Sequence, residues 1–370
     1  MLNIGIVGAG VGGLTCALML KKLGHKVTIF EKQSKSISSG VGIQLSSNAI
    51  RILRLFDLED NIASVANFPS MVDCINGHNG NKITSIPLGK IAEKKFNAGF
   101  YQLHRNDLIS ILKNKVEDFG IKINYGSPVN NLTQNSSNAK IQLLNQNYNY
   151  DFVIGADGVN SLVRKKIFPN HKPRFLKQVA FRTLIPSKNV PNIFLQDKTL
   201  LFLGNGKHAV SYPIKDKAFI NFVFCINTEN FYEQDWTREV DTSDLIKNFS
   251  DFITFEGVFE KISSLKKWGL FEYPLNKSWY NNRIILLGDA CHPILPYLAQ
   301  GASQAIEDSY VLCQSLKYNF DELYPTKFLK IYTNNRYLRV KKIKNASKNN
   351  AILYHLKNPF LKSFFHFSLK

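Results

Sequence analysis

The chain has 370 residues, of which 44% are hydrophobic and 20% charged, and its formal net charge is +19. This composition excludes a disordered chain, and the length favours one large domain or two interlocked ones. Five scattered cysteines without a CxxC pair argue against a disulfide framework or a zinc site, so we expect no bound metal and a cytoplasmic location. We also expect no signal peptide and, because no run of 18 apolar residues occurs, no membrane span.

The positive charge is spread along most of the chain, with lysines placed among asparagines and isoleucines. Because no nucleic-acid-binding motif accompanies it, we predict no nucleic-acid partner. The exception is residues 323–370, which hold eleven Lys or Arg, no acidic residue and a phenylalanine-rich end. This segment is interpreted either as terminal helix packed on the body with a solvated basic face, or as a tail that makes weak contact with a membrane surface.

In chain order, the first elements are a strand over residues 2–7, a helix over 14–23 and a strand over 26–30. The later expected elements are a helix over 46–55 capped by Ser46 or Ser47, a strand-like stretch over 67–100, a helix over 105–119, buried strands over 151–155 and 283–287, β-rich runs over 181–185, 199–203, 208–214 and 219–226, and a helix over 301–316. The β-rich runs lack crossover helices, which favours an antiparallel sheet.

The turn Gly8-Ala9-Gly10-Val11-Gly12-Gly13 follows the first strand and opens the first helix. Gly8 permits the tight turn, Gly10 lets the backbone approach a pyrophosphate, and Gly13 allows close packing of helix on strand. The N–H groups and the positive dipole end of the helix then face the phosphates. Glu31 ends the second strand, where its carboxylate accepts from ribose hydroxyls. Together these features predict an adenine dinucleotide site.

Five motifs occur in order: GAGVGG at 8–13, YQLHRNDL at 101–108, GADGVNSLVR at 155–164, GDACHP at 288–293 and PYLAQGA at 296–302. This set resembles the single-component FAD-dependent aromatic hydroxylases of the p-hydroxybenzoate hydroxylase-like fold, in particular the salicylate hydroxylase and 3-hydroxybenzoate 6-hydroxylase-like subgroup. The resemblance runs from residue 2 to about residue 356.

The resemblance and the order of the elements predict an α/β fold with a discontinuous Rossmann-like FAD-binding domain, an antiparallel β-sheet substrate domain and C-terminal helices. The expected bounds are 1–70, 98–172 and 270–322 for the FAD-binding domain, 71–97 and 173–269 for the substrate domain, and 323–370 for the basic helical segment.

The activity implied by the resemblance is that of an FAD monooxygenase dependent on O2 and on NADH or NADPH. It would hydroxylate a small aromatic or heteroaromatic substrate through a flavin C4a-hydroperoxide, with the protein supplying a dry pocket, orientation and proton management. Two alternatives stay open: a flavin oxidoreductase of the same fold acting on a quinone precursor or an isoprenoid, and a flavin-binding protein without turnover. The chain is expected to act as a monomer or a homodimer.

The resemblance also assigns cofactor contacts. Asp289 would bind the ribityl hydroxyls and Arg105 would lie near the diphosphate, while the N–H groups of Gly301 and Ala302 would stabilise negative charge on the reduced ring. Residues 40–44 resemble the flexible stretch near the flavin. The remaining expected cofactor contacts are Lys32, Gly42, Gln44, Val129 and Asp157. Asp157 and Arg164 would organise the pyrophosphate groove, or else play structural roles.

The substrate is expected between the flavin and the antiparallel sheet. The side chains expected to line this space are Arg182, Phe202, Ser211, Tyr212 and Phe222, with Pro296 and Gln300 closing the flavin side. Because side chains alternate along a strand, only one of Ser211 and Tyr212 faces the pocket squarely. Relatives that act on 3-hydroxybenzoate carry a phenol-deprotonating His at the position of Ser211, so serine there argues against that substrate. Gln300 is expected to hydrogen-bond a ring substituent, and His292 either packs beneath the flavin loop or is catalytic.

Overall fold

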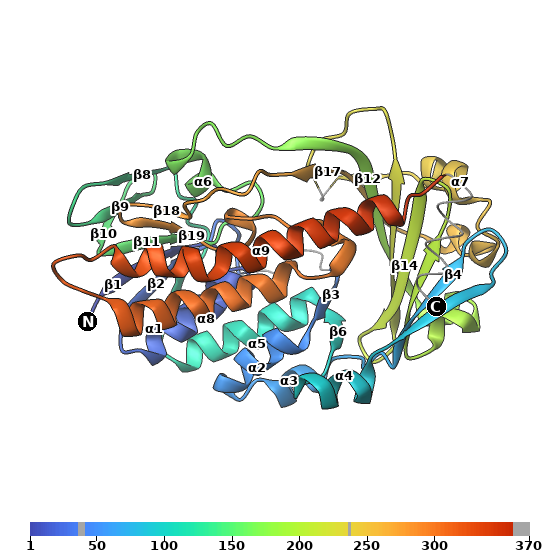
Figure 1. The fold of residues 1–370 in the computed structure, drawn as a ribbon, viewed down its shortest axis with the longest axis horizontal. Coiled ribbons are helices and arrows are strands. Elements are labelled where there is room, and N and C mark those ends of the chain that lie inside the picture. Colours follow the sequence, from blue (N-terminus) through green and yellow to red (C-terminus); the bar gives the residue numbers. More distant parts are fainter. Residues whose placement is uncertain (36–40, 236–237, 358–370) are drawn as a thin grey trace.

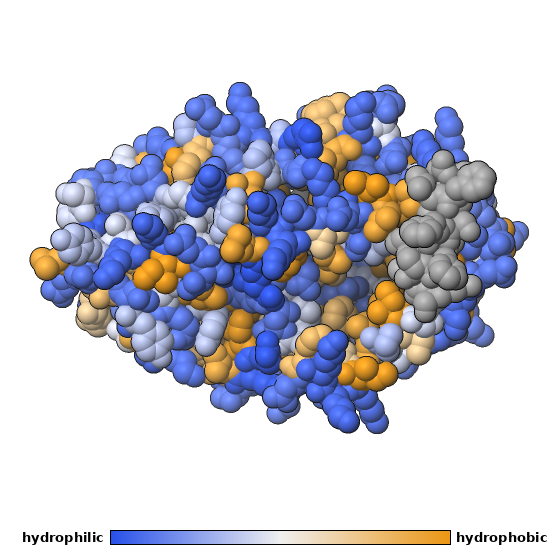
Figure 2. All heavy atoms as spheres, viewed as in Figure 1, coloured by the Kyte–Doolittle hydropathy of each residue, from blue (hydrophilic) through white to orange (hydrophobic). Residues whose placement is uncertain are grey.

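The computed structural model describes residues 1–35, 41–235 and 238–357. One half is built on a mostly parallel sheet covered by helices, and the other half on a larger sheet (Figure 1). Helix α9 (Lys327–Leu353) runs from the first half to the second (Figure 1). On the face of the molecule seen in Figure 2, hydrophilic residues predominate. None of the helices in the described residues combines the length and the apolar character that crossing a membrane requires.

The first half is organised by a sheet with the strand order β18-β19-β11-β1-β2-β7. Its strands are β1 (Asn3–Val7), β2 (Lys26–Phe30), β7 (Lys122–Asn124), β11 (Phe152–Gly155), β18 (Tyr280–Asn281) and β19 (Ile284–Leu286). All neighbours are parallel except β18 and β19. The carboxyl ends of β1, β11 and β19 therefore meet at one edge, and ligands of open α/β sheets bind outside such an edge.

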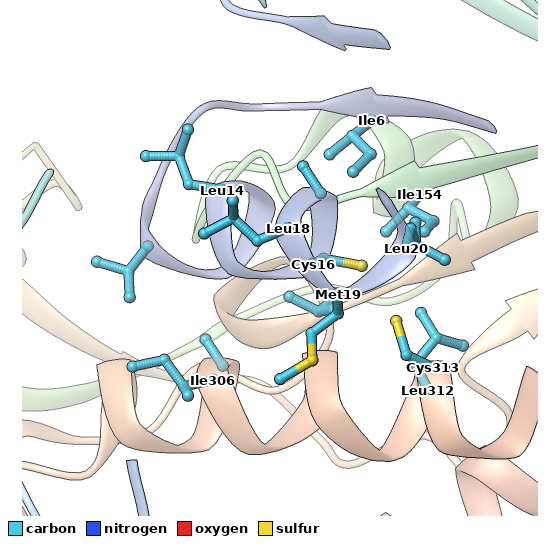
Figure 3. Close-up of a cluster of buried hydrophobic side chains, with 14 of the residues drawn as sticks. Ile6, Leu14, Cys16, Leu18, Met19, Leu20, Ile154, Ile306, Leu312 and Cys313 are labelled. Carbon is cyan, nitrogen blue, oxygen red and sulfur yellow. The ribbon is translucent and has the colours of Figure 1, made fainter. Parts of the chain in front are cut away.

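Helix α1 (Val11–Lys22) packs on strands β1 and β2 of this sheet, and α5 (Arg105–Asp118) and α8 (Gly301–Asn319) pack on α1. Because α1 lies between the sheet and α8, its residues are apolar nearly all round. Figure 3 shows Cys16 and Met19 of α1 next to the side chains of α8. Helix α9 packs on α8, where buried Arg336 donates to Asp308 at 2.6 Å.

The second half is a sheet with the order β16-β17-β12-β15-β14-β13-β4-β5. Its strands are β4 (Met71–Asn76), β5 (Lys82–Pro87), β12 (Arg174–Pro186), β13 (Lys198–Leu203), β14 (Lys207–Ile214), β15 (Phe219–Asn227), β16 (Glu239–Val240) and β17 (Leu265–Glu272). Neighbours are antiparallel except β13 and β4, which run parallel.

The two faces of this sheet have different surroundings. One row of cross-strand neighbours is Thr183, Phe222, Ser211 and Leu200, and it lies on the face of a phenylalanine-rich core under α7 (Ser243–Phe249). The adjacent row is Arg182, Val223, Val210 and Leu201, and it lies on the opposite face. That opposite face turns toward the parallel-sheet half, because Val223 and Cys225 pack with Tyr297 from that half.

Short elements complete the described chain. The strands and helices are β3 (Gly42–Leu45), β6 (Tyr101–His104), β8 (Asn131–Gln134), β9 (Ala139–Gln142), β10 (Asn147–Tyr150), α2 (Ser47–Leu53), α3 (Glu59–Ala63), α4 (Gly89–Phe96) and α6 (Leu162–Ile167). The 3-10 turns are Arg54–Phe56, Ser187–Asn189, Asn192–Leu195, Ile253–Phe255, Phe259–Lys261, Gly288–Ala290 and Pro296–Leu298.

The predicted fold class is confirmed, with three local corrections. Residues 67–100 are not strand-like throughout, because α4 forms after β5. The larger sheet is not purely antiparallel, because β4 enters it parallel to β13. Strand β17 was not among the predicted runs. The basic segment forms α9 on the body of the protein, while residues 358–370 of that segment lie outside the described residues.

Candidate active site

The glycine-rich turn is closed on its protein side and open on the other. A Cβ on Gly8, whose φ is 105°, would lie 2.5 Å from the Ala156 carbonyl oxygen, and a Cβ on Gly13 would lie 2.0 Å from the Gly8 oxygen. Gly12 and Val11 are likewise buried at the start of α1. At Gly10 a Cβ would meet only Arg105 Nη2, at 4.0 Å. The space beside Gly10 at the N-terminus of α1 is therefore open, and a phosphate group of a ligand can approach the backbone there.

Glu31 closes one end of this space. Its carboxylate accepts from the Ala9 N–H at 2.7 Å and from the Gln33 N–H at 2.9 Å, which fixes it beside the turn. Each carboxylate oxygen retains a further lone pair for a ligand hydroxyl. Of the other residues expected here, Lys32 is exposed and Val129 packs half-buried on the core of the parallel-sheet half.

Arg105 and Asp289 lie deeper in the same recess. Burial lowers the pKa of Arg105, and the negative charges of Asp289 and Glu31 oppose this shift. Within the described residues, neither carboxylate forms a hydrogen bond or an ion pair with the Arg105 side chain. The Asp289 side chain is reached by solvent, yet burial raises its pKa, with His292 and Arg105 opposing the shift. A carboxyl group that water reaches but protein surrounds lies on the floor of a recess.

The N-terminus of α8 borders Asp289. A Cβ on Gly301 would meet only Asp289 Oδ1, at 3.8 Å, and the first-turn N–H groups at Gly301 and Ala302 have no partner within an α-helix. Gln300 is held by protein groups, because its Nε2 donates to Ser46 Oγ at 3.0 Å and its Oε1 accepts from Gln304 at 3.0 Å.

Asp157 and Arg164, both from the motifs, stabilise the scaffold of the recess. Asp157 accepts from the N–H groups of Leu162 at 2.7 Å and Val163 at 3.1 Å, so it caps α6. Arg164 is buried and donates to the carbonyl oxygens of Asp289 at 3.1 Å and Ala290 at 2.9 Å, which fixes the turn that carries Asp289.

His292 also serves the scaffold. It is buried, and its Nε2 lies 2.6 Å from Asp308 Oδ2 on α8. Burial alone would raise the pKa of Asp308, but His292 and Arg336 hold it at about 2. His292 therefore packs beneath the loop, as the first of its two predicted roles requires.

A cavity of about 250 Å³ continues from Asp289 toward the larger sheet. Its walls are the segment 293–296 on one side and Arg182, Lys266 and Trp268 on the other. The Arg182 Cζ lies 5.9 Å from the centroid of the Trp268 ring, and its Nε is buried without a hydrogen-bond partner in the described part of the chain. Burial lowers the pKa of Arg182, and no carboxylate is among the described groups that oppose this shift.

The structure corrects part of the expected substrate lining. Ser211, Phe202 and Phe222 lie on the far face of the larger sheet, toward the phenylalanine-rich core, because the strands present their alternate residues to the recess. Ser211 therefore says nothing about the substrate. Tyr212 is on the near face, where its hydroxyl oxygen would lie 2.8 Å from a Cβ placed on Gly42.

The remaining predicted residues are divided. Pro296 is exposed and lines the cavity, and Gly42 donates its N–H to Asn221 Oδ1 at 3.1 Å. Gln44 is half-buried in β3, opposite Gln102 of β6. Gly40, the first residue of that predicted stretch, lies outside the described residues.

Lys266 and Trp268, two cavity residues on β17, were not among the site residues predicted from the sequence. The residues of this strand do not alternate between apolar and polar, and buried and half-buried positions alternate only in the structure, from Leu265 to Gly269. The sequence therefore carried no period-two signal for this wall.

The comparisons with known proteins agree with this geometry. A family model described as "FAD binding domain" matches residues 1–347. The chain belongs to this FAD-binding family. A 3-amino-4-hydroxybenzoate 2-monooxygenase of Streptomyces cremeus is 30% identical over 309 residues, covering 83% of this chain and 76% of that protein. A 6-hydroxynicotinate 3-monooxygenase of Pseudomonas fluorescens is 28% identical over 361 residues, covering 96% and 93%.

Solved structures share the fold. CtdE in complex with FAD and its substrate superposes with a TM-score of 0.88 at 22% identity, covering 96% of this chain and 90% of that one. A salicylate hydroxylase substrate complex gives 0.82 at 21% identity, covering 100% and 94%. The protein is an FAD-dependent monooxygenase.

The residues present fit FAD. Gly10 and Gly301 leave space where a Cβ would obstruct a ligand, and the half-buried cation of Arg105 lacks an ion-pair partner in the described residues. A diphosphate placed beside Arg105, between Glu31 and Asp289, would supply that partner, with ribose hydroxyls toward Glu31 and ribityl hydroxyls toward Asp289.

Proposed function

We propose that the protein hydroxylates a small aromatic or heteroaromatic ring that carries an anionic group such as a carboxylate, using O2 and NAD(P)H. The observation that carries this proposal is Arg182, a cation in the cavity wall whose Nε has no partner in the described residues. The names of the two sequence relatives give a hydroxybenzoate and a hydroxynicotinate as their substrates, and both ring systems bear a carboxylate.

Electrostatics supports an anion beside Arg182. Removing a guanidinium from water without a compensating charge is costly, and the planar donor fork of arginine matches a carboxylate in two hydrogen bonds. Lys266 adds a second positive charge to the same wall, and the Trp268 ring offers an aromatic surface beside it. A substrate with an anionic group and an aromatic ring matches Arg182 and Trp268 in charge and in shape.

Bound FAD supplies the transfer of electrons from NAD(P)H and the activation of O2. The chain itself holds and orients the reactants. The N-terminus of α1 and Arg105 would hold the diphosphate, Asp289 would hold the ribityl chain, and the apolar segment 293–296 would shield the ring from water. Tyr212 keeps its proton at working pH, because burial raises its pKa, with the charge of Arg182 opposing the shift.

The test is a panel of ring carboxylates and their neutral amide analogues, scored by substrate-stimulated NAD(P)H oxidation and O2 uptake with product analysis. Arg182→Gln is expected to raise KM for the carboxylate about tenfold or more and to leave KM for the amide nearly unchanged. Arg174→Gln is the matched control, because Arg174 stands on the same strand in an exposed ion pair with Glu272. Equal response of both substrates to Arg182→Gln contradicts the anionic substrate. NAD(P)H oxidation without substrate-stimulated O2 uptake contradicts the hydroxylase.

We further propose that the protein works in the cytoplasm as a monomer or homodimer, without a nucleic-acid partner. The five cysteines are unpaired and buried, which suits a reducing compartment. We also propose that the basic C-terminal segment 323–370 makes weak contact with anionic membrane surfaces. Liposome flotation tests it, and flotation that is independent of anionic lipid would contradict it.

A further inference from the structure

One face of α9 holds the cavity wall at alternate backbone carbonyls. The three hydrogen bonds are Lys344 Nζ to the oxygen of Pro293 (2.7 Å), Ser347 Oγ to the oxygen of Leu295 (2.8 Å) and Asn350 Nδ2 to the oxygen of Tyr297 (3.4 Å). Side chains three residues apart share a helix face, and the Pro293 and Leu295 carbonyls, two residues apart in a stretch without helix, share one side of the chain; the Tyr297 carbonyl follows in the 3-10 turn. The two spacings place donors and acceptors in one row.

The held segment is part of the recess. Residues 293–296 line the cavity, and they are outside regular secondary structure until the 3-10 turn Pro296–Leu298. The next residue, Ala299, has a φ of 52°, a left-handed conformation that costs a non-glycine residue free energy. Because segment 293–295 has no backbone hydrogen bonds of a helix or sheet to hold it, its shape depends on side-chain contacts such as those from Lys344, Ser347 and Asn350.

The far end of α9 is fixed to the larger sheet. The Tyr297 hydroxyl donates to Gln178 Oε1 at 2.8 Å, and Gln178 donates to Asn227 Oδ1 at 3.0 Å. His355, just beyond α9, lies 2.6 Å from the same Asn227 oxygen through Nδ1, and its Nε2 lies 2.7 Å from His208 Nδ1. Figure 1 shows α9 reaching this sheet. The helix is thus anchored on both halves while it holds the wall between them.

We propose that Lys344, Ser347 and Asn350 are positioning residues, which fix segment 293–297 against the cofactor ring and thereby set how much oxidised NAD(P)H yields product instead of hydrogen peroxide. The part concerning product rests on the function proposed above. The part concerning the wall and the cofactor does not. On this reading the basic terminal helix is part of the active-site framework.

The test uses full-length Ser347→Ala, with Ser347→Thr to restore the hydroxyl donor and Lys348→Met as the matched control. Lys348 is the next residue of α9, and its side chain instead contacts Glu272 at 3.2 Å. The first readout is FAD binding to apoprotein by flavin fluorescence and the visible spectrum of the bound flavin. Loss of one hydrogen bond that orders the wall is expected to weaken FAD about fivefold in Ser347→Ala. Ser347→Thr and Lys348→Met are expected to match wild type.

The second readout is the ratio of hydrogen peroxide formed to NAD(P)H oxidised with the best substrate of the panel. Ser347→Ala is expected to raise this ratio at least twofold, with KM for the substrate changed less. Lys344→Met is a second variant, expected to shift both readouts in the same direction. The proposal is overturned if Ser347→Ala matches wild type in FAD affinity, spectrum and peroxide ratio, or if Lys348→Met shifts them equally. If wild type accepts no aromatic substrate, the proposed function fails while the FAD readout still tests the wall.

Discussion

Replacing Gly10 with alanine separates cofactor binding from folding. Gly10 precedes α1 with φ −80° and ψ −177°, which alanine adopts without strain, and its Cβ would approach only Arg105 Nη2, at 4.0 Å. Alanine lowers the entropy of the unfolded chain, worth about 0.4–1 kcal/mol, and is a poorer N-cap than glycine by a similar amount. The apoprotein is therefore expected to keep its free energy of unfolding within about 0.5 kcal/mol.

Cofactor binding responds differently. The new methyl group projects into the space where the diphosphate approaches the N-terminus of α1, so the phosphate has to withdraw from one or two backbone N–H groups. Hydrogen bonds to a charged group contribute about 1.5–3 kcal/mol each. Losing one of them weakens FAD binding about tenfold to a hundredfold, at about 1.4 kcal/mol for each factor of ten.

The assay pairs urea unfolding of the apoprotein with FAD titration followed by flavin fluorescence. Gly13→Ala is the control for folding, because its Cβ would lie 2.0 Å from the Gly8 carbonyl oxygen and the turn must rearrange. We expect that variant to lose about 3 kcal/mol of stability. Unchanged FAD affinity in Gly10→Ala, or a stability loss equal to that of Gly13→Ala, would refute the placement of the diphosphate.

Two further predictions concern buried charges. Arg336→Met is expected to lower the free energy of unfolding, measured in urea, by about 3–5 kcal/mol, because it removes an ion-pair partner from the buried Asp308 carboxylate. Arg339→Met is the comparison, and because the Arg339 side chain is half-exposed it is expected to cost below about 1 kcal/mol. Equal losses in the two variants would contradict this prediction. Burial lowers the pKa of His355 from 6.5 to about 3. Between these two pH values the unfolded chain binds a proton that the folded chain does not, so the free energy of unfolding falls as the pH drops from 6.5 toward 3, by up to about 5 kcal/mol. His355→Asn is expected to flatten the dependence of the unfolding midpoint on pH in this window, and an unchanged slope would argue against a neutral buried His355.

The sequence by itself determined the features whose causes are local. The turn at residues 8–13 is readable because glycine is required wherever a Cβ would strike the backbone within a few residues, as at Gly13. The buried strands and amphipathic helices follow from the periodicity of apolar residues. The fold class and the family follow from five such local motifs in order. Asp289 and Arg105 were assigned to the cofactor through the family resemblance that these motifs carry, without knowledge of their neighbours in space.

The tertiary structure decided what depends on the phase and pairing of strands. The sequence does not show which of Ser211 and Tyr212 faces the recess. The register of β14 on β15 decides it, because it directs Ser211 into the phenylalanine-rich core and Tyr212 toward Gly42. Arg182 and Trp268 are far apart in the chain and meet because β12 pairs with β17, which leaves the guanidinium in the cavity wall. The row of contacts from α9 to segment 293–297 likewise joins residues some fifty positions apart. A charge pattern along a helix shows that it is basic, but only packing shows which of its side chains hold the active-site wall.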